Sequence, residues 1–143
     1  LHRRRHSFPT RRSSDLFIPL KRLTQLGFGG KNGNGNQFVS WIHELDFARA
    51  IDFIIEEKLT GNINVVSPKP QRNVDFMREL RKAVGIPFGI PISENMLKIG
   101  AKIIQTEPEL VLKSRNVIPK RLTENGFTFE YHNLEKAFKN LLS

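Results

Sequence analysis

Hydrophobic positions along this chain recur with two different periods. From Glu44 onward, apolar residues recur at spacings of three and four, which predicts an amphipathic helix that closes near Gly61. The runs on either side of it, residues 37–42 and 63–66, are short and rich in β-forming residues, as is typical of strands. Because the crossover between the runs is long enough for parallel pairing, we expect a unit of a parallel α/β sheet.

The pattern continues with a second helix and then becomes mainly helical. We expect Asn73 to cap a helix that Gly85 ends before a short strand at 86–88. Beyond Pro91, helices are expected from a cap at Ser93 through residue 105, at 109–113, after Pro119, and from a cap at Asn133 to the C-terminus. Residues 127–131 alternate like a strand, and the glycine- and asparagine-rich stretch 31–36 predicts a mobile loop.

The first sixteen residues differ from the remainder in composition. They hold five arginines and one aspartate, and their removal leaves 18 basic and 13 acidic residues, so the overall charge of +9 falls to about +5. Residues 7–16 resemble the translation of a sequencing adapter. We therefore expect residues 1–16 to be a non-native, disordered leader; a basic targeting arm is the alternative.

The remaining composition narrows the class of protein. The chain has no cysteine, which excludes disulfides and thiolate catalysis. Only two of its four histidines, His43 and His132, lie outside residues 1–16, and they are far apart in sequence, so we expect no metal site. No apolar run reaches the roughly 18 residues of a membrane span. We expect a cytoplasmic protein with neither a membrane nor a nucleic-acid partner, because a charge of about +5 without clustered aromatic residues is weak support for nucleic-acid binding.

Two motifs carry a resemblance to a known family. Trp41-Ile42-His43 with Asp46, followed by Asn64-Val65-Val66-Ser67, resembles the second half of extended short-chain dehydrogenase/reductases, the relatives of nucleotide-sugar epimerases. Further residues resemble an epimerase-like subfamily with an uncharacterised C-terminal domain; they are Val66-Ser67-Pro68, Ser114, Val117, Pro119, Leu122, Gly126-Phe127, Phe129 and Leu134. Asn116 and His132 depart from that pattern.

The resemblance implies a fold and a domain arrangement. Residues 17–90 would be the C-terminal part of an NAD(P)-binding Rossmann-type parallel sheet, and residues 91–143 a small, mostly helical C-terminal domain. The family's glycine-rich dinucleotide turn and Tyr-x-x-x-Lys pair are not in this sequence, since the single tyrosine, Tyr131, is followed four residues later by Glu135. We therefore expect no catalytic residue and no bound cofactor in this chain, and NAD or NADP in an intact parent.

Three residues are candidates for the substrate side of such a parent. His43 opens a helix at a sheet edge, where α/β ligand crevices form, although its ring is equally suited to fix that corner by a local hydrogen bond. Ser67 and Arg72 flank a loop between a strand end and a helix start, a place that receives anions well; a solvated arginine is the alternative there.

Basic residues near the C-terminal end are candidates for binding a phosphate. Arg115, Lys120 and Arg121 lie close together in sequence, and their alternative is a solvated charged surface. Relatives that use nucleotide diphosphate sugars tend to carry Arg-Asp before the aromatic-Ile-His step, where this chain has Val39 and Ser40. The sequence thus favours a part of an epimerase, dehydratase or reductase with a small-molecule substrate; a binding or regulatory protein of the same fold is the alternative.

Overall fold

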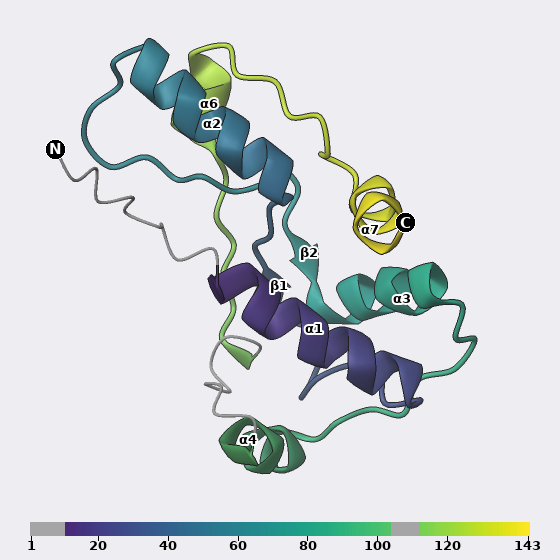
Figure 1. Cartoon of the computed structure of the whole chain (residues 1–143). Coiled ribbons are helices and arrows are strands. Elements are labelled where there is room, and N and C mark those ends of the chain that lie inside the picture. Colours follow the sequence, from purple (N-terminus) through teal and green to yellow (C-terminus); the bar gives the residue numbers. More distant parts are fainter. Residues whose placement is uncertain (1–10, 104–111) are drawn as a thin grey trace, which may run out of the picture.

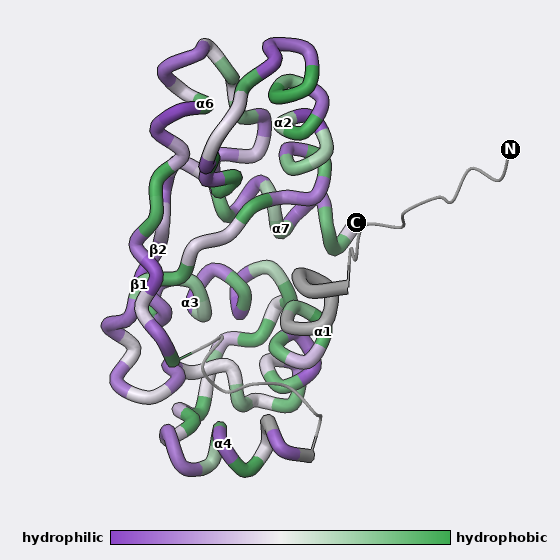
Figure 2. The backbone as a smooth tube through the Cα atoms, turned by 90° about the vertical axis from the view of Figure 1, so that its left-hand side faces the viewer, coloured by the Kyte–Doolittle hydropathy of each residue, from purple (hydrophilic) through white to green (hydrophobic). Residues whose placement is uncertain are grey.

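The computed structural model describes residues 11–103 and 112–143, in an elongated arrangement of helices around a very small sheet (Figure 1). The helices are α1 (Arg11–Gln25), α2 (Glu44–Glu56), α3 (Asn73–Val84), α4 (Glu94–Ile103), α6 (Lys120–Glu124) and α7 (Leu134–Leu142), and the strands are β1 (Phe38–Val39) and β2 (Gln71–Arg72). In Figure 2, α2 and α6 lie at one end of the molecule and α4 at the other, with α7 and α3 between them.

Helices are confirmed where they were predicted from Glu44, from Asn73, from Ser93, after Pro119 and from Asn133, although the first ends at Glu56, before Gly61. Gly85 ends α3 with a φ of 76°, a left-handed conformation that favours glycine. Asn133 caps α7 through its side-chain oxygen, which accepts hydrogen bonds from the backbone N–H groups of Glu135 and Lys136. The end expected for α4 at residue 105 and the helix expected at 109–113 fall largely outside the described residues.

Helix α1 was not predicted. It begins at Arg11, inside the expected leader, and it joins the core through Leu20, which is 6% exposed, and through Phe17, whose ring lies 5.8 Å from that of Phe138. The signal that sequence analysis missed is the helical spacing of Phe17, Leu20 and Leu23 around Pro19. Residues 11–16 of the expected leader are thus helical rather than disordered, whereas residues 1–10 lie outside the described residues and their disorder stays a prediction.

The predicted parallel sheet is not formed within residues 11–103 and 112–143. The only sheet described there has two antiparallel strands, with Phe38 opposite Arg72 and Val39 opposite Gln71. The chain turns back after α2, and Ser67 N–H donates to the Trp41 carbonyl (2.7 Å), so the segment after α2 lies beside the segment before it. Parallel pairing of the runs 37–42 and 63–66 is not seen among these residues and stays a prediction, because crossover length permits such pairing but does not require it.

The other three runs predicted as strands, residues 63–66, 86–88 and 127–131, have no strand assignment. The burial of 127–131 nevertheless alternates as predicted: Phe127, Phe129 and Tyr131 are buried, and the two residues between them are exposed. The alternation correctly identified which side chains face the core.

Two apolar clusters make up most of the core. The first joins α1, α3 and α7 and is built from Leu20, Phe76, Met77, Leu80, Leu134 and Phe138. The second joins α2 to the segment around α6 and is built from Ala50, Leu122, Phe127 and Phe129. Each cluster contains residues from both sides of the boundary expected between residues 90 and 91, and that division into domains stays a prediction.

Candidate functional site

His43 lies at the corner where the chain enters α2, and it is only 2% exposed. Its Nδ1 accepts a hydrogen bond from the backbone N–H of Leu45 (3.1 Å), so the imidazole caps the helix. Its Nε2 lies 2.9 Å from Oδ1 of Asn140 on α7, and its ring stacks on that of Tyr131 with centroids 3.9 Å apart. Both ring nitrogens are therefore occupied by the protein, which favours the structural alternative for His43.

Asp46 is the second residue of the motif that fixes this corner. Its carboxylate is fully buried in the first turn of α2 and accepts hydrogen bonds from the backbone N–H groups of Glu130 (3.0 Å) and Tyr131 (2.8 Å). Arg49, one helical turn later, donates to the same carboxylate at 2.9 Å. The Asp46 carboxylate thus accepts the backbone N–H groups of residues 130–131, which a neighbouring strand would accept in a sheet. These bonds hold residues 130–131 against α2.

Ser67 lies next to this corner, at the end of the segment that returns from α2. Its backbone N–H is bonded to Trp41, whose indole N–H in turn donates to the Lys69 carbonyl at 3.0 Å. The Ser67 hydroxyl is buried and has no hydrogen-bond partner among the described residues. An unpaired buried hydroxyl is uncommon, so Ser67 stays a candidate for a contact to substrate.

Arg72 is held by its own chain. Its guanidinium donates to the Asn36 carbonyl at 2.9 Å and lies over the ring of Phe38, 4.7 Å from the ring centroid. Phe38 is its cross-strand neighbour in the β1–β2 pair. These contacts give Arg72 a role in holding the loop before β1, and they leave less of its donor capacity for an anion.

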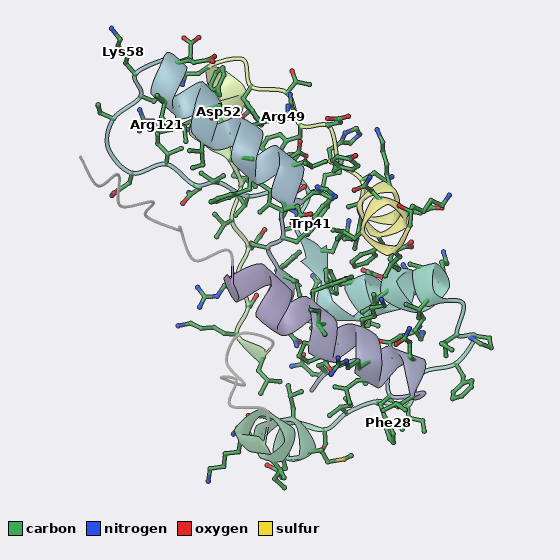
Figure 3. The ribbon with its side chains drawn as sticks, in the orientation of Figure 1. Phe28, Trp41, Arg49, Asp52, Lys58 and Arg121 are labelled. Carbon is green, nitrogen blue, oxygen red and sulfur yellow. The ribbon has the colours of Figure 1, made fainter. Side chains whose placement is uncertain are left out.

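The three basic candidates near the C-terminal end do not converge on one point. Arg115 lies beside β1, where its N–H donates to the Phe38 carbonyl and its carbonyl accepts from the Ser40 hydroxyl. Arg121 lies beside the loop after α2 (Figure 3), and its guanidinium donates to the carbonyls of Thr60 (2.5 Å) and Asn62 (3.3 Å). Lys120 is exposed and lies 3.9 Å from Glu124. Of the three side chains, Arg115 alone has no described partner.

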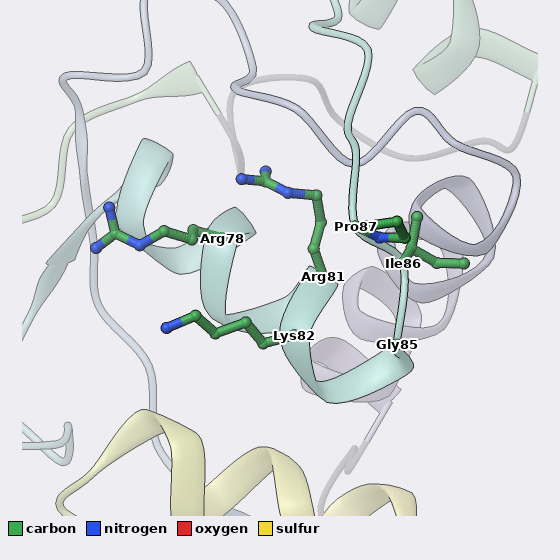
Figure 4. Close-up of a pocket in the computed structure, with 6 residues that line it drawn as sticks. All are labelled: Arg78, Arg81, Lys82, Gly85, Ile86 and Pro87. Atoms are coloured by element: carbon green, nitrogen blue, oxygen red, sulfur yellow. The ribbon is translucent and has the colours of Figure 1, made fainter.

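A surface hollow of about 370 Å³ lies at the C-terminal end of α3, away from these candidates. It is lined by Arg78, Arg81, Lys82, Gly85, Ile86 and Pro87. Each of the three basic side chains drawn in Figure 4 has a partner: Arg78 pairs with Asp75, Arg81 donates to the Gly29 carbonyl, and Lys82 pairs with Glu79. Cations are stabilised at a helix C-terminus by the helix dipole, so the hollow needs no ligand to explain it.

A group of buried amides was missed by sequence analysis. Asn73 does not cap α3 with its side chain, as we predicted; it is the first residue of that helix, and its Oδ1 accepts from the backbone N–H of Asn32 at 2.7 Å. Asn32 is fully buried, and both polar atoms of its side chain lack a partner among the described residues. Gln37 donates to the Asn32 carbonyl at 3.0 Å. No local pattern indicates this burial, because amides amid glycines are typical of exposed loops.

The glycine-rich loop does not fit a dinucleotide. Phosphate-binding loops present free backbone N–H groups, but here the N–H groups of Gly30, Gly33 and Gly35 donate to the carbonyls of Ile90, Ile92 and Asn32. A Cβ at Gly30 would lie 2.8 Å from the Gly89 carbonyl oxygen, so glycine at this position allows the close approach of two backbones. Across residues 11–103 and 112–143, no three side chains are grouped to bind a metal, and no helix is long and apolar enough to cross a membrane.

Comparison with known proteins places this arrangement in context. Residues 94–141 match the family described as a Domain of unknown function (DUF1731). The chain is 30% identical over 129 residues to the epimerase family protein YfhF of Bacillus subtilis (strain 168), covering 90% of this chain and 40% of YfhF. The chain resembles the C-terminal portion of epimerase family proteins.

Two further comparisons also match this chain to part of an epimerase family protein. The epimerase family protein SAR0825 of Staphylococcus aureus (strain MRSA252) is 34% identical over 116 residues, which are 80% of this chain and 38% of that protein. A crystal structure of human epimerase family protein SDR39U1 (isoform 2) with NADPH superposes with a TM-score of 0.78 at 26% identity, covering 89% of this chain and 43% of the human one. The epimerase-like chain thus spans about two fifths of the proteins that it matches.

Proposed function

We propose that this chain is the substrate-side C-terminal part of an NAD(P)-dependent epimerase, dehydratase or reductase, and that it is inactive by itself. The observation that carries the proposal is the superposition on a protein crystallised with NADPH, over 89% of this chain but 43% of that one. The glycine-rich loop here has its N–H groups bonded internally, so the dinucleotide belongs to the part of the protein outside the match.

The proposal extends to the fold and to the location. The extended runs of this chain belong to a Rossmann-type parallel sheet of a short-chain dehydrogenase/reductase whose other strands come from the remaining part of the protein. The intact protein is cytoplasmic and acts on a small molecule, and neither nucleic acid nor a membrane is its partner. On this chain, Ser67 is the residue best placed to contact that molecule, because its buried hydroxyl has no described partner.

A chimera tests the proposal. The part of YfhF that lies outside its match to this chain is joined to residues 17–143, and NADPH is titrated against the chimera and against the chain alone by nucleotide fluorescence. We expect saturable micromolar binding to the chimera and none to the chain alone. Saturable binding by the chain alone would show that the cofactor site has been placed in the wrong part of the protein.

A second candidate is a binding or regulatory protein that keeps the epimerase fold, favoured by the internal hydrogen bonds of His43, which occupy both ring nitrogens of this substrate-side candidate. The upstream reading frame of the parent gene discriminates between the two. A glycine-rich turn with a Tyr-x-x-x-Lys pair there favours the enzyme, and their absence favours the binding protein.

A further inference from the structure

Three asparagines of this sequence are each followed by a glycine: Asn32, Asn34 and Asn125. Asparagine is a thermally labile residue. Its side-chain amide carbon can be attacked by the backbone nitrogen of the next residue, and a following glycine hinders that attack least because it has no Cβ beside its nitrogen. The three sites are equivalent in their local sequence, but they differ in burial and in hydrogen bonding.

Asn34 lies exposed in the loop before β1, and its surroundings favour this attack. Its Oδ1 accepts a hydrogen bond from the backbone N–H of Asn36 (2.8 Å), which holds the side chain against its own backbone in an Asx-turn. The same bond draws electron density from the side-chain carbonyl and makes its carbon a better electrophile. The N–H of Gly35, the attacking group, has a bond of 3.2 Å to the Asn32 carbonyl, which is at the long end for an N–H donor. Electrophile, nucleophile and water therefore meet at Asn34.

The other two sites each lack one of these features. Asn32 is fully buried, which excludes water, and the N–H of Gly33 donates to the Ile92 carbonyl at 2.9 Å. Asn125 is exposed, but its Nδ2, which would have to leave, donates to the Arg121 carbonyl at 2.7 Å. That bond must break before ammonia can depart.

We propose that Asn34 is a site of spontaneous covalent modification, at which the side-chain amide is hydrolysed through a cyclic imide. The Gly35 nitrogen loses its proton to solvent and forms a bond to Cγ of Asn34. The bond from Cγ to Nδ2 breaks, and Nδ2 takes up a proton and leaves as ammonia. Water then opens the imide at one of two carbonyls: opening at Cγ gives aspartate, and opening at the backbone carbonyl gives isoaspartate, in which the main chain runs through Cγ. Both products carry a new negative charge.

The two products differ in their effect on α3. Carbonyls that follow Asn34 accept hydrogen bonds from the start of that helix: the Gly35 carbonyl from the N–H of Val74 (3.0 Å) and the Gln37 carbonyl from the N–H of Asn73 (2.8 Å). Aspartate keeps the main chain and a side-chain acceptor oxygen, so these bonds persist. Isoaspartate adds a methylene to the backbone just before these carbonyls, which displaces them and weakens the start of α3.

Ageing of the full chain at mildly alkaline pH and physiological temperature, followed by peptide mass spectrometry, tests the site. The conversion replaces NH2 by OH, and fragment ions locate the mass gain. We expect Asn34 to convert at least about 5-fold faster than Asn125, where a hydrogen bond must first be lost. We expect it to convert at least about 100-fold faster than Asn32, which reacts only when the core opens locally. In urea the three sites should convert at similar rates.

Two variants serve as matched controls. N34S keeps an acceptor oxygen for the Asn36 N–H but has no amide to lose, and N125S should leave the conversion at residue 34 unchanged. After ageing, hydrogen exchange at the Asn73 and Val74 amides should be faster in the parent chain, where isoaspartate accumulates, than in aged N34S or in freshly prepared N34D.

Several results would overturn the inference. Equal conversion at Asn34, Asn125 and Asn32 in the folded chain, or faster conversion at Asn125, would refute the assignment of the site. The same holds if urea leaves the ratio of the three rates unchanged, because the preference for Asn34 would then come from local sequence and not from the fold. Conversion at Asn34 without faster exchange at the start of α3 would refute the effect assigned to isoaspartate.

Discussion

Asp46 shows at the scale of one residue how a motif side chain can replace missing sheet hydrogen bonds. Its buried carboxylate is the acceptor for two backbone N–H groups of the segment before α7. We expect D46A to lower the free energy of unfolding by about 2–4 kcal/mol, because both N–H groups lose their partner. D46N keeps one acceptor oxygen and should lose less. Urea denaturation measures the change, and D52A, at an exposed site on the same helix, should change stability little.

His43 makes a second residue-scale prediction. H43A removes the cap of α2 and the contact to Asn140, so we expect a loss of about 2–3 kcal/mol. H43N restores a good capping oxygen and should recover about half of that loss. The exposed His132 provides the control, since H132A should stay within about 0.5 kcal/mol of the parent chain. Equal losses for H43A and H132A in urea denaturation would contradict the capping role.

Glycines in two helices allow a test at the scale of an element. Gly85 ends α3 at a φ of 76° and Gly100 lies inside α4, and an added Cβ would meet no atom within 4 Å at either position. G85A should lower stability by about 1 kcal/mol because alanine is strained in the left-handed region. G100A should raise it by up to about 1 kcal/mol because alanine favours the helix. Thermal unfolding of the two variants should therefore shift in opposite directions.

The helices were predicted better than the strands, for a physical reason. The helices α2, α3 and α7 carry their own hydrogen bonds and their own caps, so local spacing and residues such as Gly85 and Asn133 predicted them. A strand needs a partner that local sequence does not contain. The runs at 63–66 and 127–131 have strand-like apolar patterns but no strand beside them, and the pattern alone did not show this.

At the scale of the whole molecule, the chain exposes many apolar side chains for its size. Leu26, Phe28, Phe88 and Ile90 are exposed on two loops that hydrogen-bond to each other, and Ile55 is 68% exposed on α2. We expect the chain alone to bind a hydrophobic dye and to associate, and the chimera to bind less dye. A monodisperse monomer that unfolds cooperatively without binding dye would show instead that the chain is autonomous.

The first ten residues give another prediction for the whole molecule. Removing residues 1–10 leaves α1 and its contacts through Phe17 and Leu20 intact. We expect the thermal midpoint to shift by less than about 2 °C, because a shift of several degrees in a domain of this size needs about 1 kcal/mol. Differential scanning calorimetry measures it, and a drop of several degrees would show that the leader has a structural role.

Sequence patterns were enough to predict most helices, the inward side chains of 127–131, and the similarity to epimerase family proteins. The helices and the inward side chains depend on residues that are close together in the chain. The family similarity depends on sequence motifs that can be identified without knowing the three-dimensional contacts. Only the three-dimensional contacts show that the Ser67 N–H meets the Trp41 carbonyl and that Asn32 is buried. The same holds for Arg72 and Arg121, which donate to carbonyls of their own chain. These contacts join residues 26 to 61 positions apart, and no local preference specifies which distant group a polar side chain will meet.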